Sequence, residues 1–250
     1  MLPSSWKPID APALVRLGSA NDGGYLVSPA AVERATLLLS MGLNDDWAFE
    51  EDFLRRGAAR VVCFDHSVNN GFWRWYALNG VLKLSPKRVG RFFEYRRFFA
   101  SPRAEHRQLK IGYDEPGGVS LATLLTEMKD SDIFLKMDIE GSEYRVLDDV
   151  VAHAERFSGM AIEFHDVDLH RDRISAFFQA LKGFRVVELH GNNFGGLDPA
   201  GDPLVIEVSL TRADLVGGGT GMTPVPSATP CDPAREEILL RYAPEARAAG

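Results

Sequence analysis

The chain has 250 residues, of which 45% are hydrophobic and 25% charged, and its formal net charge is -7. This length suits one large α/β domain, and the negative charge argues against a nucleic-acid partner, which usually requires a basic face. No stretch approaches the ~18 apolar residues of a membrane span, the start of the chain lacks a signal-peptide pattern, and Cys63 and Cys231 are too few for a disulfide framework. We therefore expect a cytoplasmic protein with no stable membrane insertion.

Short apolar runs alternate with helical patterns along most of the chain. This alternation predicts a mostly parallel sheet that helices cover on both faces. The predicted strands are 35–42, 60–65, 108–112, 132–138, 159–165, 184–190 and 204–210. The predicted helices are 46–57, 69–79, 119–129, 142–155 and 168–182.

The last two strands are joined by residues 191–203, a Gly/Pro-rich segment that is too short for a crossover helix. They should therefore pair antiparallel as a hairpin. Five strand–helix units and a closing hairpin are the element order of the Rossmann-like class I methyltransferases, with seven strands. We expect this domain to span residues 35–212.

The segments that flank this predicted domain have their own patterns. Residues 1–34 form an N-terminal extension in which the Asn-Asp-Gly-Gly turn of 16–28 predicts a β-hairpin, or a flap over a ligand with Tyr25 as its cover. Residues 213–250 form a Gly/Pro-rich tail, which we expect to be loose except for a short helix at 234–242.

The turn after the first predicted strand, SMGLNDDWAFEED, carries acids where a dinucleotide-binding protein has glycines. Gly42 permits a tight turn, and Asp46 and Glu50 would repel a pyrophosphate and attract a cation. S-adenosylmethionine, with a sulfonium and an ammonium group and no phosphate, suits such a turn. Capping of the next helix by Asp45 or Asp46 is the alternative interpretation.

Acidic residues and histidines follow the later strands as well. Asp65, after the second strand, is placed to accept hydrogen bonds from ribose hydroxyls, or is simply a turn residue. The ends of neighbouring strands meet at one rim of the sheet, so these side chains should converge as a general base or as metal ligands. The converging set is Asp138, Glu140, His165 and His190.

The stretch FLKMDIEGSEYRVL, at 134–147, resembles the signature of the FkbM-type methyltransferase family, K-x-D-x-E-G-x-E. The match falls on Lys136, Asp138, Glu140, Gly141 and Glu143. The first turn is similar to that family's G-x-x-x-D-x-x-F-D/E variant, which Gly42, Asp46, Phe49 and Glu50 carry.

The resemblance covers roughly residues 16–210. It implies a Rossmann-like fold, S-adenosylmethionine as methyl donor, and O-methylation of a small molecule or glycan. The residues that we assign to the cofactor are Gly42, Asn44, Asp46, Glu50, Asp65, Asp138 and Glu140. Asp138 or His165 is the candidate base, and His190 is the next candidate after them.

Two other functions stay open at this stage. The D-x-D at 166–168 is a pattern of metal-dependent glycosyltransferases, and the glycine-poor first turn would also fit a methyltransferase-like domain without catalysis. A divalent metal is not predicted, although Asp138, His165 and His190 leave it open. The sequence does not indicate an oligomeric state.

Residues 87–103 interleave arginines with phenylalanines outside the predicted core motifs. Such a pattern is typical of an amphipathic helix or strand with a core-facing Phe side and a solvated Arg side. It also occurs in segments that bind a membrane surface or RNA, and an acidic sugar is a third use for the arginines.

Overall fold

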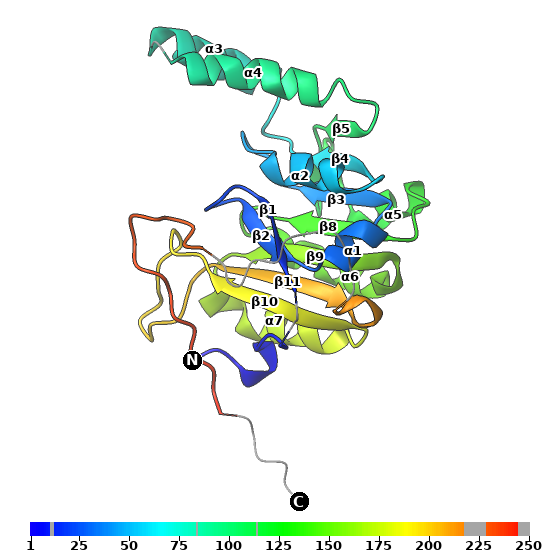
Figure 1. The fold of residues 1–250 in the computed structure, drawn as a ribbon, viewed down its shortest axis with the longest axis vertical. Coiled ribbons are helices and arrows are strands. Elements are labelled where there is room, and N and C mark those ends of the chain that lie inside the picture. The colour runs from blue at the N-terminus through cyan, green and yellow to red at the C-terminus, as the bar shows by residue number, and fades with distance from the viewer. Residues whose placement is uncertain (11–12, 84, 114, 218–228, 245–250) are drawn as a thin grey trace, which may run out of the picture.

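The fold is a seven-stranded sheet with helices on both faces (Figure 1). The computed structural model describes all residues except 11–12, 84, 114, 218–228 and 245–250. The sheet comprises β3 (Leu37–Met41), β4 (Arg60–Phe64), β5 (Ala104–Arg107), β8 (Ile133–Met137), β9 (Phe157–Phe164), β10 (Phe184–Gly191) and β11 (Ile206–Arg212). The helices are α1 (Pro29–Arg34), α2 (Ala48–Arg56), α3 (Asn70–Leu82), α4 (Pro86–Phe98), α5 (Leu121–Glu127), α6 (Leu147–Ala152) and α7 (Val167–Ala180).

The strand order confirms the predicted class I methyltransferase fold. It runs β10-β11-β9-β8-β3-β4-β5, with β11 antiparallel to both of its neighbours and the other pairs parallel. The central strands β3 and β8 are buried along their whole length, because both faces of the sheet are covered. Their carboxyl ends therefore open at one rim, where a ligand can reach them.

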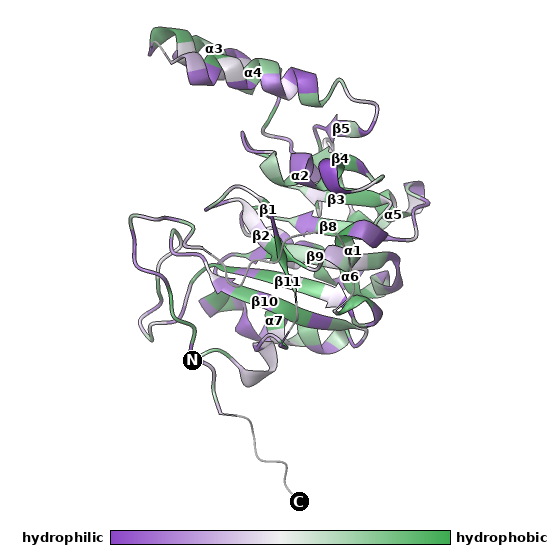
Figure 2. Ribbon diagram, viewed as in Figure 1, coloured by the Kyte–Doolittle hydropathy of each residue, from purple (hydrophilic) through white to green (hydrophobic). Residues whose placement is uncertain are grey.

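Two apolar cores lie on opposite faces of the sheet. Leu37, Leu39 and Met41 of β3 belong to one core, with residues of α5, α6 and α7, whereas Leu38 belongs to the other core, with residues of α1, α2 and the β1–β2 hairpin. In Figure 2 the strands of the sheet are coloured mostly as apolar. Alternate side chains of one strand thus stabilise two different layers.

The predicted N-terminal hairpin is confirmed. β1 (Val15–Gly18) and β2 (Gly24–Val27) pair antiparallel through a turn that contains Asp22 and Gly23. Tyr25 is buried in this hairpin, packs edge-on against Phe49 and donates a hydrogen bond to Glu163 at 3.3 Å. It is therefore a core residue of the hairpin, while the turn reaches the sheet rim.

The predicted strand at 108–112 is wrong. The third strand of the sheet along the chain is β5 instead. Within 108–112, β6 (Lys110–Ile111) pairs with β7 (Gly118–Val119) in a separate small sheet. An edge strand needs no apolar run, and β5 buries only Ala104, so no apolar pattern marks it.

The predicted helix at 234–242 is absent from the described residues 229–244, which turn at 231–235 and then pass beside the N-terminus without helical hydrogen bonds (Figure 1). The backbones of Leu2 and Tyr242 bridge, and Asn193 accepts a hydrogen bond from the Asp232 amide at 2.7 Å. Residues 229–244 therefore form hydrogen bonds with the N-terminus and with the residues after β10, and no helix. This segment is not loose, contrary to the expectation for the tail.

The Arg/Phe stretch forms α4, which pairs with α3 as a helical arm above β4 and β5 (Figure 1). No residue of α4 is fully buried, but its aromatic side is half-buried and packs against the core that contains Leu38, as the sequence pattern predicts. Its rings contact two members of that core, Trp73 and Trp47, and Trp47 lies at the start of α2.

Gly42 ends β3 at the point where the chain passes closest to β8. Its φ is +85°, and a Cβ there would lie 1.7 Å from the Asp138 carbonyl oxygen. Gly42→Ala should therefore destabilise the fold by at least the ~1–3 kcal/mol that left-handed backbone costs a non-glycine residue. Urea unfolding measures this loss.

Gly90→Ala is the matched control, because Gly90 lies within α4 and a Cβ there would have no heavy atom within 4 Å. We expect no loss there, and a gain of up to ~1 kcal/mol. Equal effects of the two substitutions would contradict the close approach of β3 and β8.

Candidate active site

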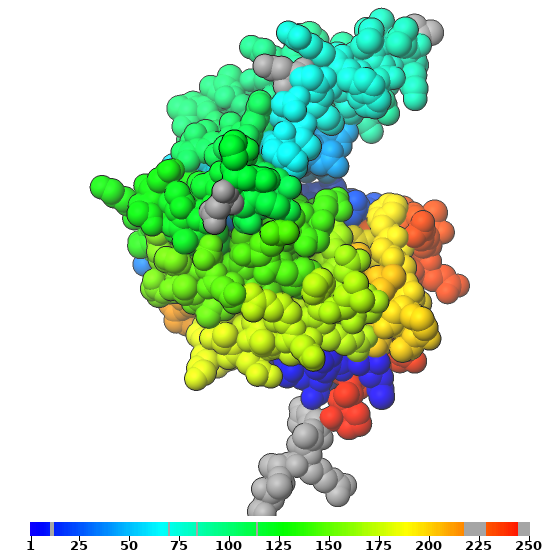
Figure 3. Space-filling view, turned by 180° about the vertical axis from the view of Figure 1, so that it is seen from behind, coloured from blue at the N-terminus to red at the C-terminus, as the bar shows by residue number. Residues whose placement is uncertain are grey.

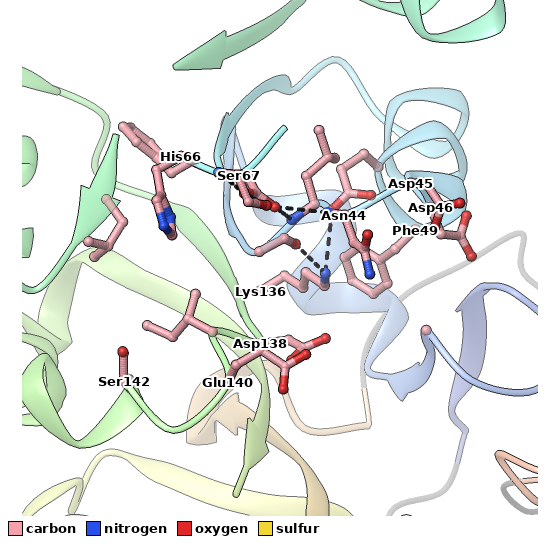
Figure 4. A pocket seen from close by; sticks show the side chains of 18 of the residues that line it. Asn44, Asp45, Asp46, Phe49, His66, Ser67, Lys136, Asp138, Glu140 and Ser142 are labelled. Atoms are coloured by element: carbon pink, nitrogen blue, oxygen red, sulfur yellow. Dashed lines mark hydrogen bonds and ion pairs between the residues drawn. The ribbon is translucent and has the colours of Figure 1, made fainter. Parts of the chain in front are cut away.

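A cavity of about 570 Å³ opens at the carboxyl rim of the sheet (Figure 4). Its wall comes from the turns after β3, β4 and β8, from residues 109–111 and from the tip of the β1–β2 hairpin. All seven residues assigned to the cofactor from sequence line it: Gly42, Asn44, Asp46, Glu50, Asp65, Asp138 and Glu140. The polar residues that follow β3, β4 and β8 therefore meet at one cavity.

The wall is strongly acidic. Seven carboxylate residues face two lysines, Lys110 and Lys136; the acids are Asp22, Asp45, Asp46, Glu50, Asp65, Asp138 and Glu140. In a partly enclosed space such an excess of negative charge attracts a cation and repels a phosphate. The cavity thus selects for ligands that carry positive charge.

Asp65 holds the first turn in shape. Its Oδ2 atom accepts hydrogen bonds from the Leu43 and Asn44 amides at 3.0 and 2.9 Å, and its Oδ1 atom accepts from Ser67 and Val68. Burial raises the pKa of Asp65, but these hydrogen bonds outweigh it, so the pKa is lowered. Because a carboxylate offers about four acceptor positions, a ribose hydroxyl would have to share them.

Asp46 connects three parts of the structure. Its carboxylate accepts from the Ala48 amide at the start of α2, from the Ser19 hydroxyl of the hairpin turn and from Arg91 of α4. Asp46 therefore bonds to the first amide of α2 and also lines the cavity. Asp46 fixes the distance between the hairpin tip, the first turn and the helical arm.

Glu50 and Lys136 form a buried pair beneath the first turn. The Lys136 ammonium donates to the Gly42 carbonyl oxygen at 2.7 Å and lies 4.0 Å from Glu50 Oε1, which accepts from Ser40 at 2.5 Å. Burial raises the pKa of Glu50 despite the nearby lysine. Glu50 is therefore a fully buried member of the cavity lining that is paired with Lys136.

The three acids after β8 have three different positions. Asp138 lines the cavity, Glu140 is exposed at its rim, and Glu143 is fully buried. Glu143 Oε1 accepts from the Ile139 and Gly141 amides at 3.0 and 3.3 Å, which holds the left-handed turn formed by Glu140 and Gly141. Only the first two acids can meet a ligand directly.

His165 lies beside Asp138 at the end of β9. Its Nδ1 atom is 3.1 Å from Glu143 Oε1, and its Nε2 atom is 3.5 and 3.7 Å from Glu140 and Glu163. Burial lowers the pKa of His165, but the carboxylates of Glu143, Glu163 and Asp138 outweigh it and raise the pKa to about 9. His165 is therefore an imidazolium at neutral pH.

Asp138, Glu163 and His165 offer ligand atoms within 4.8 Å of one another, a spacing that a divalent cation accepts. The proton on His165 competes for that position. His190 does not join this group: its two ring nitrogens lie 3.0 and 2.7 Å from Glu207 and Glu237, away from the cavity lining.

The acids of the D-x-D pattern also lie outside the cavity lining. Asp166 has a left-handed φ of 49° and precedes α7, and Asp168 lies in the first turn of that helix. Conversely, the lining includes Asp22, which sequence reasoning treated only as part of a hairpin turn. The one feature of the sequence that could have assigned Asp22 to the cavity is its position in the predicted flap over a ligand.

Comparisons with known proteins give one family match and a set of distant structural neighbours. The sequence profile of the methyltransferase FkbM domain matches residues 34–195. No curated protein sequence matches the chain.

Two solved structures illustrate its structural neighbours. An rRNA methylase from Streptococcus thermophilus is similar with a TM-score of 0.40 at 11% identity, over 73% of this chain and 92% of that one. Precorrin-6y C5,15-methyltransferase from Geobacter metallireducens GS-15 gives a TM-score of 0.39 at 8% identity, over 74% and 86%.

The imidazolium of His165 should make stability depend on pH. Because the folded pKa of about 9 exceeds the ordinary 6.5, its contribution is complete below pH 6.5 and is lost as pH rises through 9. The free energy of unfolding should fall by about 2–3 kcal/mol over this range. Urea unfolding at several pH values measures the loss.

His165→Gln should remove most of this slope, whereas His66→Gln, on the exposed cavity rim, should leave it intact. An NMR titration of the His165 ring with a midpoint near or below 6.5 would contradict the assignment.

Proposed function

The chain belongs to the FkbM methyltransferase family, and from this premise we propose that it methylates a hydroxyl group of a small-molecule or glycan acceptor. The observation that carries the proposal is Asp138, a carboxylate on the cavity wall beside a histidine that already holds its proton. We propose that S-adenosylmethionine is the donor, which supplies an activated methyl group when bound. The chain must then orient the acceptor and remove its proton.

The residues of the cavity suit this cofactor. The carboxylates match its sulfonium and ammonium charges, while the apolar part of the wall matches a heteroaromatic base; that part is Leu43, Phe49, Phe64, Leu109, Ile111 and Ile139. The volume of about 570 Å³ lies within the usual ~300–1,000 Å³ of small-molecule sites. The turn from Gly42 to Asn44, held by Asp65, would form one side of the cofactor site.

Among the three candidate bases, the contacts favour Asp138. His165 is protonated at neutral pH and has no free position for another proton, and His190 is held between two glutamates. In the described part of the chain, no hydrogen bond engages the Asp138 carboxylate. We therefore assign proton removal to Asp138 and the stabilisation of its negative charge to the His165 imidazolium.

The two alternative functions receive less support. A glycosyltransferase would need Asp166 and Asp168 at the ligand, and neither lines the cavity. A domain without catalysis would not require a carboxylate beside an imidazolium at the strand end. Nucleic acid stays open as an acceptor, because a negative net charge over the whole chain does not exclude a local basic surface.

The central test is Asp138→Asn. It should bind S-adenosylhomocysteine within a few-fold of the unchanged protein, since it retains the shape of the site, but lose methyl transfer to a panel of hydroxylated sugars and glycans by at least ~100-fold. Isothermal titration measures the binding, and release of S-adenosylhomocysteine measures the turnover.

Asp65→Ala is the matched variant on the opposite wall. It frees the Leu43 and Asn44 amides, so it should weaken cofactor binding. Failure of the folded, unchanged protein to bind either form of the cofactor would overturn the proposal. Binding of UDP-glucose with manganese would favour the glycosyltransferase instead.

A further inference from the structure

The helical arm formed by α3 and α4 has a rigid base. Trp73 and Tyr95 pack with ring centroids 4.6 Å apart, and both contact Trp47 at the start of α2. Arg91 lies over the Trp47 ring and bonds to Asp46, while Tyr95 bonds to His106 of β5. The arm is therefore fixed to the body at its base and cannot fold its outer half into the core.

The two helices of the arm expose a group of large apolar side chains. Their exposed fractions lie between 57 and 72%, and they are Trp75, Leu78, Val81, Leu82 and Phe93. Trp75, Leu78 and Leu82 follow the i, i+3, i+7 spacing of one helix face. Figure 3 shows the arm standing off from the body, with a hollow beneath it.

The arm is also the basic part of an acidic protein. Residues 70–98 contain seven lysines and arginines and one glutamate, a net charge of +6, whereas the whole chain carries -7. Five of these cations are exposed on the same two helices or the turn between them: Arg74, Lys83, Lys87, Arg96 and Arg97. Apolar tips among solvated cations are typical of helices that lie in the interface of an anionic bilayer.

We propose that the α3–α4 arm docks the protein on an anionic membrane surface. The apolar side chains enter the boundary between headgroups and acyl chains, and the exposed cations contact the lipid phosphates. Among the described residues, none of the helices combines the length and apolar character of a membrane span.

Other occupants fit the surface less well. A dimer that joins arm to arm would place two surfaces of like charge against each other, which opposes that mode of self-association. Single-stranded RNA would use the cations and aromatic rings, but Leu78, Val81 and Leu82 offer it no stacking surface. Aliphatic side chains and cations together match a lipid surface best.

Docking would bring the cavity to the membrane. α3 begins directly after the Asp65–Ser67 rim, and Arg91 of α4 bonds to Asp46 and to the Asp45 carbonyl oxygen on the cavity wall. The acceptor of the proposed methyl transfer would then be a hydroxyl on the headgroup of a membrane amphiphile, a step that rests on the proposed function.

The test is co-sedimentation of the full chain with vesicles of phosphatidylglycerol and phosphatidylcholine, compared with phosphatidylcholine alone. We expect binding to the anionic vesicles that weakens with salt, with a blue shift of Trp fluorescence. The triple variant W75S/L78S/L82S should bind at least ~10-fold more weakly. R96Q/R97Q should lose about 10-fold as well.

Two control variants match these changes. L169S alters an equally exposed leucine on α7, and R55Q/R56Q removes two exposed arginines from α2, so neither should change vesicle binding. Because sedimentation measures binding without turnover, loss of methyl transfer would not affect this result.

Absence of binding to anionic vesicles by the folded protein would overturn the proposal. Without vesicle binding, a dimer in sedimentation velocity that the triple variant abolishes would show that the arm binds a second copy instead. A gel shift of single-stranded RNA that the triple variant weakens would show that the arm binds RNA instead. Equal binding to neutral vesicles would contradict the role of the cations.

Discussion

A buried ammonium group at the end of the central strand holds the site together. Lys136 of β8 donates to the Gly42 carbonyl oxygen and faces Glu50 of α2, so one charge joins two neighbouring strands and the following helix. Burial lowers the pKa of Lys136, but Glu50 and the other surrounding anions outweigh it, so the group stays charged. A buried charge without such partners would be strongly unfavourable.

The chemistry of the cavity depends on this arrangement. The turn that Lys136 supports presents its amides to Asp65, and Asp46 in the same turn bonds to the hairpin and to the arm. Asp46 and Asp65 are thus held in place by hydrogen bonds from the chain itself. A cationic ligand would balance the charge of the acidic wall, while the arm leads from the same turn to a second, basic surface.

The sequence predicted the parts that depend on local pattern. The apolar runs located the central strands, and the K-x-D-x-E-G-x-E motif located Asp138, because both reflect residues near in sequence. The sequence did not predict β5, because an edge strand requires no apolar pattern. It also did not predict the contact of Glu237 with His190, because these residues lie far apart in the chain. The division at residues 35 and 213 stays a prediction, although the hairpin tip and the C-terminal segment both contact the domain.

The most direct test of the central interaction is a double-mutant cycle on Lys136→Met and Glu50→Gln, measured by urea unfolding. Lys136→Met alone should cost about 3–5 kcal/mol, because it leaves Glu50 buried without its cation, and adding Glu50→Gln should recover part of that loss. If the two losses simply add in the double variant, the pair does not support the turn, and the dependence of the site on Lys136 is contradicted.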